Sequence, residues 1–206
     1  MTARNPTHRM GLHDVALGLQ RHIVDDVING REAVPDVAPT SESGRLAALR
    51  RYDVLNTGPD ETFDSITRLA GLVLDSPAAA ITFIDSDRAW FKSRYGWDGH
   101  QQIDRGVSFC ATTYPGGREP WTIPDAVLDP RTRDNPLVLA DPRVRSYAGA
   151  PLISHDGHNL GALCVFDHES REYTSRQLDA LRDLAGLVLH EMEMRLATRR
   201  ALFPDS

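Results

Sequence analysis

The chain has 206 residues, of which 41% are hydrophobic and 25% charged, a composition that fits one globular domain with extensions and excludes a disordered or fibrous chain. With 29 acidic against 23 basic residues the formal net charge is -6, so we expect no broad positive field and no nucleic-acid partner. The amino-terminal sequence MTARNPTHRMGLHD lacks the apolar stretch of a signal peptide, and no run approaches the about 18 apolar residues of a membrane span, which argues against a membrane partner.

The cysteines indicate the redox compartment. Cys110 and Cys164 are the only two, and each lies in apolar sequence. Two such residues suit a reducing compartment better than a disulfide framework. We therefore expect a cytoplasmic location.

Three segments are expected along the chain. Residues 10–29 place apolar side chains at helical spacing with charges between them, which predicts an amphipathic helix. The breaker-rich stretch that follows reads as a linker. The predicted domains are therefore 1–40, helix and linker; 41–200, the main domain with a long carboxyl-terminal helix; and 201–206, a tail.

The main domain opens with two helices and a hairpin. Ser43 is the expected cap of a helix over residues 45–52, and the Gly58–Glu61 turn predicts the start of a second. Residues 78–85 and 89–95 are apolar and rich in β-formers, and the turn residues Ser86 and Asp87 lie between them. This pattern predicts a β-hairpin.

Residues 96–144 are rich in Gly, Pro, Asp and Arg, and only residues 121–123 offer a short strand. A stretch this long without strong regular structure is uncommon in a compact domain unless it carries function or small local helices. We expect a pocket to form here.

A second hairpin and a long helix complete the pattern. Residues 145–154 and 159–167 flank the tight-turn pair Asp156 and Gly157, and from Ser175 the chain reads as one helix. Hairpin strands with helices before, between and after them predict an α+β fold built on an antiparallel sheet.

The last helix carries an apolar seam at alternating steps of three and four residues, with further leucines on its other sides. One helix cannot hide all of this surface from water, so we predict a homodimer through the seam. In the alternative, the helix at residues 10–29 covers the surplus in a monomer. The predicted interface residues are Leu178, Leu181, Ala185, Val188 and Met192.

Seven segments, in this order and spacing, carry a family resemblance: RLAAL at 45–49, TFDSIT at 62–67, FIDSDRAWFK at 83–92, SFCA at 108–111, LDPR at 128–131 with NPL at 135–137, YAGAPL at 147–152, and DG at 156–157 leading to LGALCVFD at 160–167. Over residues 45–195 the chain resembles the GAF family, in particular bacterial signalling GAF domains. The resemblance implies a profilin-like sheet of five or six antiparallel strands. Helices would pack on one face, and loops would roof a pocket on the other.

GAF domains are usually regulatory. They bind cyclic nucleotides, bilins, haem or small metabolites, or only dimerise, and they commonly sit beside histidine kinases or cyclic-di-nucleotide enzymes. The resemblance therefore implies a non-catalytic sensory domain that binds a small ligand or a partner protein. Such a partner would be a signalling protein. We expect no output domain in the remaining residues, so the signal would leave by homodimerisation.

The candidate pocket combines aromatic side chains with a polar rim in the irregular region and at its edges, although each aromatic alone also suits plain core packing. Asp129 and Arg131 also suit a structural turn. The candidate ligand-binding residues are Phe83, Trp90, Phe91, Ser108, Phe109, Cys110, Trp121, Asp129, Arg131 and Tyr147.

The cofactor stays unknown. The cyclic-nucleotide signature of the family is not matched, because Pro136 follows Asn135, and covalent bilin attachment needs a histidine where Ala111 follows Cys110. No histidine is expected on a pocket wall, which disfavours haem. His155 and His158 would offer zinc only two ligands, so we expect no metal. The four histidines considered for haem are His100, His155, His158 and His168.

An enzymatic alternative comes from another branch of the family, which reduces free methionine sulfoxide with pocket cysteines. This chemistry needs a nucleophilic thiolate and a second thiol within reach. Cys110 is the candidate nucleophile or redox-sensing thiol, whereas Cys164 is expected in the core. Neither cysteine has the sequence context of that branch, so no catalytic residue is assigned.

Overall fold

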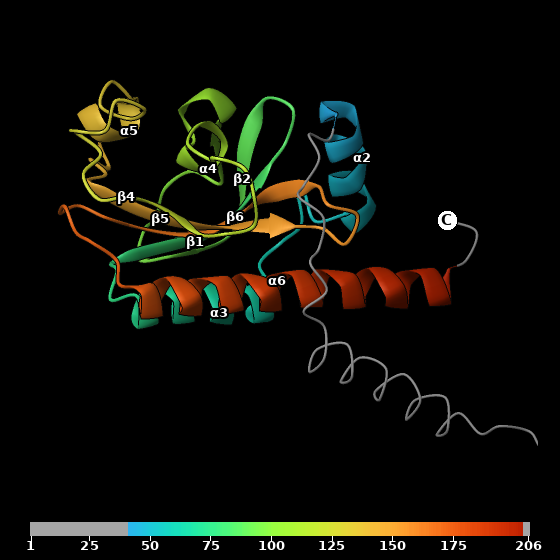
Figure 1. Cartoon of the computed structure of the whole chain (residues 1–206). Coiled ribbons are helices and arrows are strands. Elements are labelled where there is room, and N and C mark those ends of the chain that lie inside the picture. The colour runs from blue at the N-terminus through green and yellow to red at the C-terminus, as the bar shows by residue number, and fades with distance from the viewer. Residues whose placement is uncertain (1–40, 204–206) are drawn as a thin grey trace, which may run out of the picture. The chain divides into compact units, whose positions relative to one another are not determined.

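A six-stranded antiparallel sheet organises the chain in the order β3-β2-β1-β6-β5-β4. The computed structural model describes residues 41–203, drawn in colour in Figure 1. The sheet and its helices confirm the predicted α+β class. The strands are β1 (Ala78–Ile84), β2 (Arg88–Tyr95), β3 (Gln102–Asp104), β4 (Trp121–Ile123), β5 (Ser146–Ile153) and β6 (Asn159–Asp167).

Three long helices, α2 (Glu42–Tyr52), α3 (Glu61–Val73) and α6 (Ser175–Leu202), begin at side-chain caps. The Asp60 carboxylate accepts hydrogen bonds from two backbone N–H groups in the first turn of α3. Thr174 and Gln177 form a reciprocal capping box that starts α6. For α2 the predicted cap was wrong: Ser41 accepts from the Gly44 N–H, so Ser43 lies inside the helix.

The strands present alternate residues to two separate cores. On β1, Ile81 and Phe83 join the core shared with the long helices, and Ala80 and Ile84 join the core on the other face. Figure 1 shows α3 and α6 side by side beneath the sheet, with the small helices α4 and α5 on its opposite side. The helical layer therefore covers one face, as expected.

The seam of α6 lies in the helix-facing core. Leu181, Ala185, Val188 and Met192 are at most 3% exposed, and Leu178 is half-buried against the same core. The prediction that this seam forms a dimer interface was therefore wrong, because these side chains are already buried within a single chain. A helix that packs on a sheet needs the same spacing of three and four as one that packs on a second chain.

The region between β2 and β5 contains β4, which confirms the short strand predicted at residues 121–123, and further short elements that the sequence pattern did not resolve. Besides β3 and β4, it holds a 3-10 helix, η1 (Arg105–Val107), and the helices α4 (Phe109–Thr112) and α5 (Pro136–Leu139). These elements lie over the second face of the sheet. The helix predicted at residues 10–29 and its linker lie outside the described residues, and α6 extends to Leu202 rather than ending at residue 200.

Candidate ligand pocket

The second face of the sheet forms the floor of a cavity of about 450 Å³. At its centre, Cys164 on β6 lies opposite Ala80 on β1 and Gly149 on β5. A Cβ atom on Gly149 would come within 2.6 Å of the Tyr147 hydroxyl and 2.7 Å of the Trp121 ring. Small residues at these positions therefore leave room for the larger side chains around them.

Aromatic and aliphatic side chains dominate the pocket walls, with few polar groups among them. The Trp97 ring stands edge-on to Phe91 at 4.7 Å and to Phe166 at 5.5 Å between ring centroids. An apolar cavity of this size with a few polar groups is typical of small-molecule sites. The roof comes from the loop and short elements after β2, through Trp97, Asp98, Gly99, His100, Ile103, Ser108, Phe109, Cys110, Leu137, Asp141, Pro142 and Val144.

Two thiols and a phenol meet in this pocket. The Sγ atoms of Cys110 and Cys164 are 3.6 Å apart, and the Tyr147 hydroxyl donates a hydrogen bond to Cys110 Sγ at 3.2 Å. All three side chains are buried. Thr82 Oγ1 lies 3.9 Å from Cys164 Sγ on the floor side. The sequence prediction of Cys164 as a core residue missed that its sulfur also lines the pocket.

The close contact separates the acidities of the two thiols. The hydrogen bond with Cys164 and that from Tyr147 lower the pKa of Cys110 to about 7, against the opposing effect of burial. The Cys110 contact and burial raise the pKa of Cys164 well above its usual range. Cys110 is therefore the more acidic of the two thiols.

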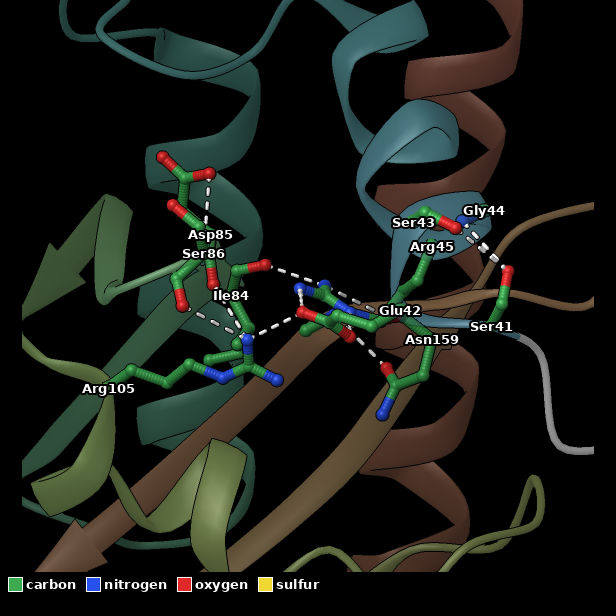
Figure 2. A network of polar contacts seen from close by, with 11 residues as sticks. Ser41, Glu42, Ser43, Gly44, Arg45, Ile84, Asp85, Ser86, Arg105 and Asn159 are labelled. Carbon is green, nitrogen blue, oxygen red and sulfur yellow. Dashed lines mark hydrogen bonds and ion pairs between the residues drawn. The ribbon is translucent and has the colours of Figure 1, made fainter.

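An arginine network connects α2, the end of β1 and η1, as Figure 2 shows. Arg45 of α2 is buried and donates to the Ile84 carbonyl at 2.6 Å and to the Glu42 carboxylate at 2.8 Å. Arg105 of η1 donates to the same carboxylate at 2.6 Å and to the backbone carbonyl of Ser86 at 3.2 Å. Glu42 thus links α2 to the segment that leads into α4.

The family model of the GAF domain matches residues 58–191. The chain belongs to the GAF family. A cyclic di-GMP phosphodiesterase from Pseudomonas aeruginosa is 41% identical over 152 residues, which are 73% of this chain. This GAF chain spans only 26% of that relative.

Two solved structures illustrate the shared GAF fold. The GAF domain of an Acinetobacter phosphoenolpyruvate-protein phosphotransferase has a TM-score of 0.53 at 14% identity, covering 79% of this chain and 97% of that one. Free methionine-R-sulfoxide reductase from Neisseria meningitidis, solved in complex with its substrate, has a TM-score of 0.54 at 16% identity, covering 80% and 96%. Identities this low show the fold alone.

The GAF pocket contains half of the residues predicted for it, namely Phe91, Ser108, Phe109, Cys110 and Tyr147. Phe83 and Trp90 were wrongly assigned, because their side chains belong to the core beneath the sheet. They face each other in the β1–β2 pairing, whereas Phe91 pairs with Thr82 on the opposite face. Neighbouring aromatic residues on a strand point to opposite faces, and the sequence did not indicate which faced the pocket.

The remaining three predicted residues lie outside the pocket lining. Trp121 packs behind Tyr147, with ring centroids 5.7 Å apart, and its indole N–H donates to Thr113 at 2.9 Å. Asp129 and Arg131 pair with each other in the loop after β4, at 2.6 Å, so their assignment to the pocket was wrong. The Arg131 guanidinium lowers the pKa of Asp129 as part of this local turn.

Sequence reasoning also missed several pocket residues, including Trp97, His100 and Leu137. The expectation that no histidine lines the pocket was wrong for His100. The alternation along β6 could have identified Cys164, which shares its face with Ala162 and Phe166.

Within residues 41–203, no group of three or more His, Cys, Asp or Glu side chains could hold a metal ion. None of the helices described there combines the length and apolar character needed to cross a bilayer.

Proposed function

We propose that this GAF domain is a sensory domain that binds a small ligand in its pocket and transmits binding through a homodimer, without catalysing a reaction itself. The observation that carries this proposal is the cavity of about 450 Å³ between the sheet and the short roof elements. Its aromatic walls favour a ligand with a flat or apolar body, and Ser108 and His100 are among the polar residues of its lining.

The two leucines of α5 offer a matched test of ligand binding. Leu137 lines the pocket, whereas Leu139, on the same short helix, is 67% exposed outside it. Leu137→Trp should fill the cavity and weaken binding of the apolar dye anilinonaphthalene sulfonate by about tenfold or more. Leu139→Trp should bind like the unmodified protein.

Titration of dye fluorescence on the full chain measures this difference. Circular dichroism would verify that both variants fold. Equal dye affinity in the two tryptophan variants would contradict the assignment of this pocket as the ligand site. Native mass spectrometry of freshly purified protein would complement the titration by detecting any retained ligand.

The homodimer is proposed through the outward side of α3 and α6 in place of the buried seam. Both helices expose apolar side chains there: Leu69 and Leu72 on α3, and Leu187 and Met194 on α6. Burying such residues against a second copy would remove apolar surface from water. These four residues are the proposed dimer surface.

Light scattering after size exclusion tests the dimer surface. Leu187 is 53% exposed, so Leu187→Glu should leave the fold intact and reduce a dimeric mass to that of one chain. Leu139→Glu places the same charge elsewhere on the surface and should leave the dimer unchanged. A single-chain mass for the unmodified protein would refute the proposal.

The phosphodiesterase relative points to a place in cyclic di-GMP signalling. We propose that the chain regulates such an enzyme, as another domain or a partner, and does not hydrolyse the nucleotide. Incubation of the purified chain with cyclic di-GMP should show no hydrolysis above that of buffer. Turnover that increases with protein concentration would overturn the non-catalytic assignment.

One observation favours a second candidate, the thiol-dependent reduction of free methionine sulfoxide. Cys110 and Cys164 bring two sulfur atoms within 3.6 Å in the same pocket. Two thiols at this distance could become a disulfide while the sulfoxide oxygen leaves as water. Methionine formation that disappears in Cys110→Ser would support this enzyme over the sensor, and no methionine formation would exclude it.

A further inference from the structure

The two cysteines that line the pocket are close enough to react with each other. Cys110 lies on α4 in the roof and Cys164 on β6 in the floor, and both line the cavity. Their Sγ atoms are 3.6 Å apart, and a disulfide requires about 2.05 Å. An approach of about 1.5 Å, within the reach of rotamer adjustment and a small shift of α4, would join them.

We propose that hydroperoxides oxidise Cys110 and Cys164 to an intramolecular disulfide that draws α4 toward the sheet and weakens ligand binding in the pocket. The oxidation is independent of the proposed function, whereas its effect on binding rests on it.

The reaction proceeds in two balanced steps. The Cys110 thiolate attacks one oxygen of the hydroperoxide, so that an S–O bond forms, the O–O bond breaks and an alcohol, or water from hydrogen peroxide, leaves with a proton. The Cys164 sulfur then attacks the sulfenic sulfur of Cys110, forming the S–S bond and releasing water with the Cys164 proton. The peroxide gains the two electrons that the thiols lose.

The surroundings assign the first step to Cys110. The Tyr147 hydroxyl donates to its sulfur at 3.2 Å, and a thiolate accepts such a hydrogen bond more strongly than a thiol does. The hydrogen bond with Cys164 and that from Tyr147 lower the pKa of Cys110 to about 7, whereas the Cys110 contact and burial raise the pKa of Cys164. Cys110 is therefore the thiolate that attacks, and Cys164 is the thiol that resolves.

The floor also favours closure of the bond. Cys164 is flanked by Ala80 and Gly149, and neither places a long side chain between the sulfur atoms. The roof side is the four-residue helix α4, which is shorter than the strand beneath it and carries Cys110 at its second position. A new bond would thus bring a short roof element closer to a fixed strand and reduce the volume between them.

Intact-mass measurement on the full chain tests the oxidation directly. The reduced protein is treated with hydrogen peroxide, unfolded and exposed to N-ethylmaleimide. The expected product has lost two hydrogens and takes up no maleimide. Oxygen addition at Cys110, with Cys164 still able to react with maleimide, would overturn the proposal, and so would two unreacted thiols after peroxide treatment.

Variants test the assigned roles. Cys164→Ser leaves no resolving thiol, so it should accumulate oxygen on Cys110 in place of the disulfide. Tyr147→Phe keeps the ring and removes only the hydroxyl, so disulfide formation near neutral pH should slow by about threefold to tenfold. An unchanged rate would contradict the role of Tyr147, while the mass of the unmodified protein decides the disulfide without any variant.

Dye titration of the reduced and oxidised protein tests the effect on the pocket. Oxidation should weaken binding of anilinonaphthalene sulfonate by about fivefold or more, and added dithiothreitol should restore it. Equal affinity in both states would refute the effect on binding. Failure of the reduced protein to bind the dye would count against the proposed function alone, because the mass measurement reports the disulfide separately.

Discussion

The two faces of one sheet serve different purposes in this molecule. Beneath the sheet, β1 contributes Ile81 and Phe83 to a core filled by the long helices. Above it, the neighbouring residue Ala80 forms part of the floor of a cavity of about 450 Å³. The alternation of strand side chains lets the same strands build a dense core on one side and a binding space on the other.

The coverings of the two faces differ in the same way. The helix-facing side is covered by α3, with 13 residues, and α6, with 28. The pocket side is covered by α4 and α5, with four residues each, and by loops between them. Short elements with few buried contacts open locally at low free energy. Ligand entry is therefore expected through the roof, and global stability is expected to depend on the helix-facing core.

Removing a large side chain from the helix-facing core should have the largest effect. Leu181 is fully buried, so Leu181→Ala should lower the free energy of unfolding by about 2–5 kcal/mol. Leu202→Ala, on an exposed residue of the same helix, should change it by less than about 0.5 kcal/mol. Urea unfolding of both variants measures the difference. Similar midpoints would show that this core does not dominate stability.

A smaller effect on stability is expected at Gly149, where the pocket floor has no room for a side chain. Gly149→Ala would place a methyl group against Tyr147 and Trp121, and should lower stability by about 1–3 kcal/mol. Gly186→Ala, in open space on α6, should raise stability by about 0.5–1 kcal/mol. Thermal unfolding measures whether each variant is less or more stable than the unmodified protein. A stabilising Gly149→Ala would mean that the floor can move aside.

The regular elements were predictable because local signals determine them. The two hairpins and α6 followed from alternation, turn residues and caps within a few positions of each strand or helix end. The surface that covers the apolar face of α6 was harder to predict. The seam containing Leu181 and Val188 fits packing on a sheet as well as packing on a second chain. Periodicity identifies an apolar stripe without identifying the surface that covers it.

The pocket was half predictable because its residues converge from distant parts of the chain. Cys110 and Tyr147 were found through the irregular region and the family resemblance, but the contact between Cys110 and Cys164 spans 54 positions. Asp129 and Arg131 had the residue types of a binding rim, yet their spacing of two allowed a local ion pair that keeps them in their own turn. Sequence order alone could not separate local from distant pairing.

The smallest expected effect concerns the carboxylate that links α2 to the roof. Arg45, together with Arg105, lowers the pKa of Glu42 from 4.5 to about 2. The folded state therefore gains stability from the ionised carboxylate above the ordinary pKa and loses it as the pH falls toward the lowered one. Because the Glu42 side chain is 48% exposed, Glu42→Gln should reduce stability at neutral pH by less than about 1 kcal/mol.

The pH dependence distinguishes this ion network from simple packing of the side chain. The deficit of Glu42→Gln should be largest near about pH 7 and shrink steadily toward about pH 3, because the unfolded chain takes up a proton at this carboxylate below its ordinary pKa while the folded protein keeps it ionised. Urea unfolding across this range measures it, with Glu172→Gln, on an exposed residue, as the control. A deficit of equal size at both ends would show that Glu42 contributes through contacts other than its charge.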